Sequence, residues 1–282
     1  MNTHIRYCFV VTLFFTIAAC AIHYPKPSAE LKIENSVVLP LVLAETSGLY
    51  CEDDVLYSLN DSGNAPVVFS VSRTGSVNNE DKLVLTNRDW EAISADEKAY
   101  YIADVGNNKG RRATVSIYKV SRSDVNDFSE LTLQYAKNDP SANMPYAHDY
   151  DAEAMVKAPE GLLLFSKSWR TGVAHVYRIN EGESSQILSP IADIEGLPGV
   201  ITGADFDKRR NLYVFTGYKS DPFGNFSAFL AQVSTTFSVI NVWPLKSYKQ
   251  VEGVCVDSSG DYWFSEEATE GRQATLNRAV VH

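Results

Sequence analysis

The sequence of 282 residues has few of the features that identify an enzyme class or a membrane protein. It contains no Gly-x-Ser-x-Gly turn, no phosphate-binding loop and no His-Glu-x-x-His pair, so serine hydrolase and zincin mechanisms have no support. The apolar run from Cys8 to Ala19 has 12 residues, which is too short to span a bilayer. No Pro/Gly-rich linker divides the rest of the chain, which favours one domain.

Positive charge is also in short supply. The chain has 25 Lys and Arg against 35 Asp and Glu, a formal net charge of −10. Such a chain repels phosphate backbones, so a nucleic-acid partner is not expected. An acidic balance is compatible with binding of cations.

The N-terminal apolar run reads as a targeting segment. It follows Arg6 and ends in Ile17-Ala18-Ala19-Cys20, which resembles a bacterial lipobox. This resemblance implies a signal peptide over 1–19, acylation of Cys20, a lipidated tether over 20–32 and a folded domain over 33–282. Ala21 favours the outer membrane of a bacterial cell envelope. The alternative is an ordinary secretory signal that is cleaved nearby.

A short pattern recurs through the folded part of the chain. A Ser, Thr or Glu is followed by a small residue and then an apolar residue, at spacings of 44, 62, 49 and 50. Repeats of this length are typical of a β-propeller, in which each repeat is one four-stranded blade. The aligned first residues are Ser47, Glu91, Glu153, Thr202 and Glu252.

The pattern predicts an all-β propeller of five blades. The last repeat is one strand short, and we expect the segment from Ser36 to Val42 to pair with Ala274 to Val281 and close the ring. Closure removes the exposed edges of an open sheet. Six blades are the alternative, if 138–149 or 193–199 contains a further blade.

Two cysteines lie on inner strands of blades that closure makes neighbours. Cys51 follows Ser47 by four residues and Cys255 follows Glu252 by three. Side chains alternate between the faces of a strand, so these offsets point the two thiols toward each other across the seam. We expect either a disulfide, which an exported protein permits, or two buried free thiols.

The aligned residues converge on the propeller axis. Three carboxylates so close together raise one another's pKa or require a cation. The hard oxygens of the carboxylates and of the two hydroxyls suit Ca²⁺. No His or Cys stands at these positions, which disfavours Zn²⁺. The alternative is structural, with the side chains bonded to neighbouring backbones or to water. The predicted metal ligands are Ser47, Glu91, Glu153, Thr202 and Glu252.

The order Ser, Glu, Glu, Thr, Glu over five blades resembles the calcium-activated nucleotidases (apyrases). That resemblance implies a five-bladed propeller with one axial Ca²⁺, and it covers only the blade pattern and these five positions, with Thr202 where the family has Ser. The phrases Asn60-Asp61-Ser62-Gly63-Asn64, Asp89-Trp90-Glu91-Ala92-Ile93 and Asp104-Val105-Gly106-Asn107-Asn108 are also similar to bacterial esterase-like and phytase-like propellers. Function differs widely across such folds.

Polar residues that follow the second strand of each blade should rim one mouth of the channel. Trp169 offers a ring for stacking, and Lys167, Arg111 and Arg112 offer cations for phosphate or carboxylate. The Asn and Asp residues among them are also ordinary turn residues. The predicted ligand-binding set is Asp61, Asp104, Arg111, Arg112, Lys167, Trp169, Tyr218 and Glu266.

Two functions remain open at this stage. The first is a membrane-anchored module that holds Ca²⁺ and binds a small anionic ligand or an envelope protein at the channel mouth. The second is a Ca²⁺-dependent phosphohydrolase acting on nucleotides or other phosphate esters. In that case the metal polarises a phosphoryl oxygen, and Glu91 or Glu153 accepts the proton of the attacking water.

Overall fold

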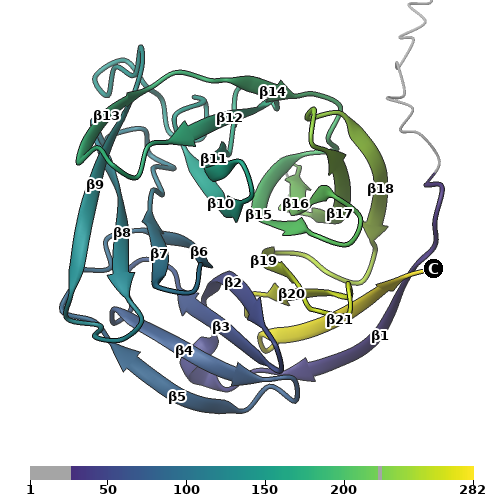
Figure 1. Cartoon of the computed structure of the whole chain (residues 1–282). Helices are drawn as coiled ribbons and strands as arrows, with labels where there is room; N and C mark the ends of the chain where they lie inside the picture. The colour runs from purple at the N-terminus through teal and green to yellow at the C-terminus, as the bar shows by residue number, and fades with distance from the viewer. Residues whose placement is uncertain (1–26, 222–223) are drawn as a thin grey trace, which may run out of the picture.

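The computed structural model describes residues 27–221 and 224–282. Five sheets are arranged like blades around a central axis (Figure 1), and the predicted five-bladed all-β propeller is confirmed. The expected signal peptide and Cys20 lie outside the described residues. Within the described ranges, no helix combines the length and the apolar character that a membrane span requires.

The blades are numbered in chain order, and each contains four antiparallel strands. Blade 1 consists of β2 (Thr46–Glu52), β3 (Val55–Asn60), β4 (Val67–Ser72) and β5 (Val77–Lys82). Blade 2 consists of β6 (Trp90–Ala95), β7 (Ala99–Asp104), β8 (Val115–Ser121) and β9 (Phe128–Tyr135). Blade 3 consists of β10 (Ala152–Ala158), β11 (Gly161–Ser166), β12 (Ala174–Ile179) and β14 (Ala192–Ile194). Blade 4 consists of β15 (Val200–Asp207), β16 (Leu212–Ser220), β17 (Phe226–Ser234) and β18 (Val239–Leu245). Blade 5 consists of β19 (Val251–Val256), β20 (Tyr262–Glu266), β21 (Thr275–Val281) and β1 (Leu31–Val38).

The hydrophobic core is divided among the seams between blades. Each of five buried clusters draws its side chains from two neighbouring blades. Strands near the axis are covered on both faces, and β7 is buried along its whole length. The outermost strands have one face in water; β5, for example, is largely exposed. The sequence therefore shows apolar runs near the axis and more polar strands at the rim.

The first and last strands close the ring. β1 pairs antiparallel with β21, with Val37 opposite Leu276, and the chain termini of the described domain lie side by side (Figure 1). The predicted closing strand, Ser36 to Val42, is misplaced by several residues, and its observed start at Leu31 falls within the expected tether. Pro40 has no N–H for a strand ladder, and the chain turns there into the short 3-10 helix η1 (Leu41–Leu43).

The structure excludes the alternative of six blades, because neither segment that suggested a sixth blade contains one. Residues 138–149 form a loop of turns between β9 and β10 and contain no strand. Asp193 belongs to β14, the outer strand of blade 3. The extra strand β13 (Ser185–Leu188) pairs in parallel with β9 and widens blade 2 rather than starting a blade of its own. The long loop explains the one spacing of 62 in the repeat.

A disulfide joins Cys51 of β2 to Cys255 of β19, and their Cα atoms are 5.4 Å apart. The bond crosses the seam between blade 1 and blade 5. Blade 5 is also where β1 meets β21, so two links of different kind hold the closing region of the ring.

Candidate functional site

The aligned residues share one local structure, which is a β-bulge in the first strand of each blade. In blade 1 the pairing of β2 with β3 shifts between Thr46 and Gly48, which leaves Ser47 as the extra residue. A bulge re-aims a side chain out of the strand alternation, and bulges are over-represented next to active sites. The register shifts in the five blades bracket Ser47, Glu91, Glu153, Thr202 and Glu252 in turn.

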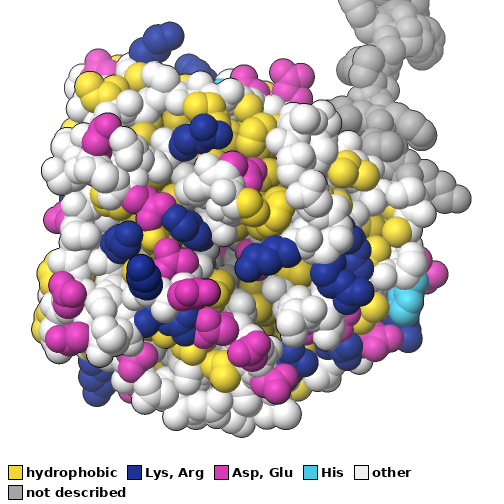
Figure 2. Space-filling model, viewed as in Figure 1, with side chains coloured by type: hydrophobic (Ala, Val, Ile, Leu, Met, Phe, Trp, Pro, Cys, Tyr) yellow, Lys and Arg dark blue, Asp and Glu magenta, His cyan; other side chains and the backbone are white. Residues whose placement is uncertain are grey.

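The bulges direct these residues to the axis, where a pocket of about 500 Å³ opens at one end of the ring. Ser47, Glu91, Glu153 and Glu252 line this pocket. Thr202 lines a separate small cavity of about 10 Å³, which Ser47, Glu91 and Glu153 also line. A second pocket, of about 710 Å³, lies at the other ends of the inner strands. Viewed along the axis, the molecular surface is hollowed at its centre, with side chains of both charges around the hollow (Figure 2).

The pocket wall is strongly acidic. Lys167 supplies a single ammonium group, and four rings complete the wall, those of Tyr146, Trp169, Tyr218 and Phe226. Six carboxylates face it, those of Glu45, Asp61, Glu91, Glu153, Glu252 and Glu267.

The two hydroxyls of the aligned set donate hydrogen bonds to backbone carbonyls of neighbouring blades. Ser47 Oγ donates to the carbonyl of Trp90 at 2.8 Å, and Thr202 Oγ1 donates to the carbonyl of Val251 at 2.6 Å. Each acceptor directly precedes the aligned Glu of the next blade. These hydroxyls therefore tie neighbouring inner strands together, as the structural alternative predicts.

Glu153 already has a cation beside it. The Lys167 ammonium forms an ion pair with Glu153 Oε1 and donates to Tyr218 Oη at 3.0 Å. It also lies 4.7 Å from the ring centre of Trp169 and 5.1 Å from that of Tyr218. Lys167 is only 3% exposed. The second oxygen of Glu153, Oε2, is buried without a hydrogen-bond partner.

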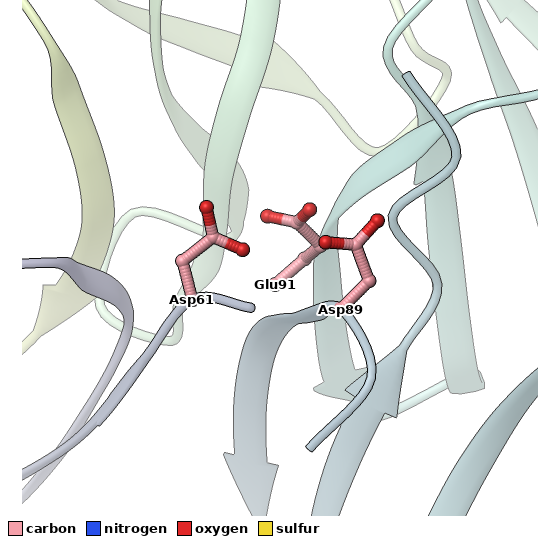
Figure 3. A group of neighbouring side chains, drawn as sticks. All are labelled: Asp61, Asp89 and Glu91. Atoms are coloured by element: carbon pink, nitrogen blue, oxygen red, sulfur yellow. The ribbon is translucent and has the colours of Figure 1, made fainter. Parts of the chain in front are cut away.

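A second group of carboxylates extends from the axial Glu91 to the entry of blade 2 and the end of β3 in blade 1. Asp61 follows β3, Asp89 precedes β6 and Glu91 lies on β6, and the three carboxylates point toward one another (Figure 3). One oxygen from each lies within 4.8 Å of the others. We call these three residues the carboxylate trio. They are hard oxygen donors of the kind that Ca²⁺ and Mg²⁺ prefer.

Polar contacts of the neighbouring loops position the trio. The Asn87 amide donates to the carbonyls of Asn60 and Asp61, both at 2.9 Å, which ties the entry of blade 2 to the end of β3. Gly106 packs directly against Asp89 and Glu91. A Cβ at this position would lie 2.5 Å from Asp89 Cγ and would also clash with Glu91 Oε1, so a larger residue would displace the carboxylates of the trio.

The pKa values of the acidic groups reflect this crowding. Burial, followed by the Glu153 carboxylate, raises the pKa of Glu91 well above its ordinary value. Burial and then the charge of Asp61 raise the pKa of Asp89 to about 6. Burial also raises the pKa of Glu153 to about 8, although Lys167 opposes the shift. Such values indicate a site in which negative charge lacks compensation.

Several predicted ligand-binding residues do not face the pocket. Arg112 is buried and forms a 2.6 Å ion pair with Asp104, and it donates to the Gly106 carbonyl, so this pair supports the loop behind the trio. Arg111 donates to the carbonyl of Pro140. Glu266 is buried and paired with Arg272. These side chains bind other groups of the protein, and the position of a residue after a strand in the sequence does not predict such contacts.

Lys167, Trp169, Tyr218 and Asp61, also from the predicted ligand-binding set, line the pocket. The sequence pattern includes Asp89 in a segment that is similar to other bacterial propellers, but it assigns this residue no role. It also gave no role to Glu45, Tyr146 or Phe226, and it selected Glu266 where Glu267 lines the pocket. The signal for Asp89 was its place two residues before an aligned Glu, at the entry to an inner strand.

No family model and no curated protein matches the chain. Among solved structures, the chain is similar to the PQQ-bound form of an aldose sugar dehydrogenase from Streptomyces coelicolor, with 11% identity, a TM-score of 0.53 and coverage of 92% of this chain and 100% of that one. It is also similar to a virginiamycin B lyase from Staphylococcus aureus, with 12% identity, a TM-score of 0.40 and coverage of 88% and 74%. At these identities the likeness is one of fold, and these comparisons do not support the nucleotidase resemblance. In fold, the chain is a five-bladed β-propeller.

Proposed function

We propose that this protein is an exported binding module that takes up Ca²⁺ and a small anionic ligand at the mouth of the propeller channel. The observation that carries the proposal is the composition of the 500 Å³ pocket, where six carboxylates face one ammonium and four aromatic rings. Its volume is in the range of small-molecule sites.

The imbalance of charge makes the cation a requirement for an anionic ligand. Two like charges about 4 Å apart repel by roughly 4 kcal/mol at the effective dielectric of a protein surface, and six carboxylates share this pocket. Lys167 is already paired with Glu153 and offsets little of that charge. A bound Ca²⁺ offsets two further charges and offers open coordination positions to ligand oxygens.

The aromatic wall indicates the shape of the ligand. Trp169 and Tyr146 meet edge to face with ring centres 5.3 Å apart, and Tyr218 and Phe226 do the same at 5.1 Å. Flat apolar surfaces beside polar groups suit a ligand ring, such as that of a sugar. Small sugar acids and sugar phosphates therefore match both parts of the pocket.

Phosphate hydrolysis is the weaker candidate. Among the described residues that line the pocket, Lys167 is the one basic side chain, and the arginines expected to hold phosphate are engaged elsewhere. Phosphate release from a nucleotide panel that requires both Ca²⁺ and Glu153 would favour the enzyme instead.

The binding proposal predicts that Ca²⁺ raises the melting temperature and that EGTA reverses the rise, because only the folded protein offers the site. It also predicts that sugar acids or sugar phosphates change the fluorescence of the protein when Ca²⁺ is present, since Trp169 lines the pocket. Equal melting with Ca²⁺ and EGTA, together with unchanged fluorescence, would refute the proposal.

We also propose that the module is tethered to the envelope through acylated Cys20, with the outer membrane as its location. β1 begins at Leu31, 11 residues after Cys20, and a segment of that length reaches about 35 Å when extended. Labelled palmitate should enter the protein in bacterial cells and should be absent from the Cys20→Ala variant. Equal labelling of both proteins would contradict the anchor.

A further inference from the structure

We infer that the cation of this module is held off the axis, between blades 1 and 2, by Asp61, Asp89 and Glu91, and that the axial position itself is occupied by Lys167. This inference rests on the proposed function and specifies where its cation binds. It differs from the sequence prediction, in which the five aligned residues form the metal site.

Three of the five aligned residues already have partners within the protein; of the other two, Glu91 belongs to the carboxylate trio and Glu252 does not. The hydroxyls of Ser47 and Thr202 donate to backbone carbonyls of neighbouring blades. Oε1 of Glu153 is paired with the Lys167 ammonium, which brings a positive charge among the axial carboxylates. A metal on the axis would compete with a buried ammonium that contacts Glu153, the hydroxyl of Tyr218 and the rings of Trp169 and Tyr218.

Among the described residues, no lysine or arginine forms an ion pair with the carboxylate trio, although Asp61 accepts a hydrogen bond from the backbone N–H of Ser62. Glu91 is only 5% exposed, and among the described residues its carboxylate has no hydrogen-bond or ion-pair partner. A buried carboxylate in this state is costly unless a cation or a proton joins it. Its oxygens point to those of Asp61 and Asp89, within 4.8 Å of one another, which is a span that one metal ion can bridge (Figure 3).

A further observation outside the trio also points to a missing ligand. Glu153 is 3% exposed and lines the same pocket, and its Oε2 has no hydrogen-bond partner. The amide oxygen Oδ1 of Asn108, another pocket residue, is likewise buried and without a partner. These oxygens are suited to accept hydrogen bonds from water molecules that complete the coordination shell of a cation.

The trio also determines which ligands fit. Ca²⁺ takes six to eight oxygen ligands, and three carboxylates supply only part of that shell. Asp61 and Glu91 belong to both the trio and the pocket wall, so the remaining coordination positions face the pocket. A ligand that carries a carboxylate or phosphate oxygen would complete the shell, with its ring against Trp169 or Tyr218.

The test is a calorimetric titration of the full-length protein with Ca²⁺. In Asp89→Asn the affinity should fall at least about tenfold, as expected when a site loses a charged ligand. Asp61→Asn should behave in the same way, and it guards against a folding defect specific to one variant. Glu252→Gln removes a carboxylate from the same pocket but from the axial set, and it should lower the affinity less than either trio variant does. Circular dichroism without Ca²⁺ checks that each variant is folded.

The outcomes separate the inference from the function on which it rests. Loss of Ca²⁺ binding in Glu252→Gln with retention in Asp89→Asn and Asp61→Asn would place the metal on the axis and overturn the inference, while the proposed function would stand. Absence of Ca²⁺ binding by the wild-type protein would overturn both.

Discussion

At the scale of single residues, Lys167 decides how the acidic channel is stabilised. The Lys167 ammonium pairs with Glu153. Burial alone would lower the pKa of Lys167, but the nearby Glu153 carboxylate outweighs burial and raises this pKa well above its ordinary value. We predict that Lys167→Met lowers the free energy of unfolding by about 3–5 kcal/mol, because it leaves Glu153 buried without its partner. Urea unfolding at a pH above the value of about 8 that the Glu153 pKa has in the wild-type protein measures the effect.

The matched control is the double variant Lys167→Met/Glu153→Gln, which removes both charges. It should recover most of the lost stability, since a neutral pair of similar volume carries no uncompensated charge. If the single and double variants unfold at the same urea concentration, the ion pair has no role in compensating the channel charge.

At the scale of elements, the inner strands explain the repeated sequence pattern. The small residue in each repeat is small because neighbouring inner strands approach closely: a Cβ on Gly253 would lie 2.8 Å from the backbone nitrogen of Leu49 in blade 1. We predict that Gly253→Ala costs about 1–3 kcal/mol of unfolding free energy, as overpacking does in a close-packed interior.

Gly182→Ala is the control for that substitution. Gly182 is exposed, and the nearest atom to an added Cβ is 3.5 Å away, an ordinary contact distance. This variant should stay within about 0.5 kcal/mol of the wild type, as surface changes usually do. A Gly253→Ala protein that is equally stable would mean that the inner strands tolerate wider spacing than the structure indicates.

Some features of the inner strands can be predicted from the sequence, and others cannot. The spacing of the repeat predicts the blade count and the direction of Glu153 and Glu252 toward the axis, because equivalent positions in a propeller converge. It does not predict that Lys167 reaches the axis from the end of β11, since that depends on side-chain contacts between blades. For the same reason, the sequence alone predicts neither the role of Asp89 nor the ion pair between Asp104 and Arg112.

At the scale of the whole molecule, the ring is closed by β1 and by the disulfide between Cys51 and Cys255. The disulfide links residues 204 positions apart, so it restricts most of the unfolded chain. We predict that Cys51→Ala/Cys255→Ala keeps the fold but loses about 2–4 kcal/mol of unfolding free energy. Guanidinium unfolding, with circular dichroism to confirm the β-sheet content, tests this, and unchanged stability would contradict it.

Crystallography can locate the cation that we place at Asp61, Asp89 and Glu91 in the acidic mouth of this propeller. Crystals grown with Mn²⁺ in place of Ca²⁺ give an anomalous signal at the metal. We expect one peak bounded by the three carboxylates, with Lys167 still paired to Glu153. A peak on the axis between Glu153 and Glu252, or no peak in the pocket, would contradict it.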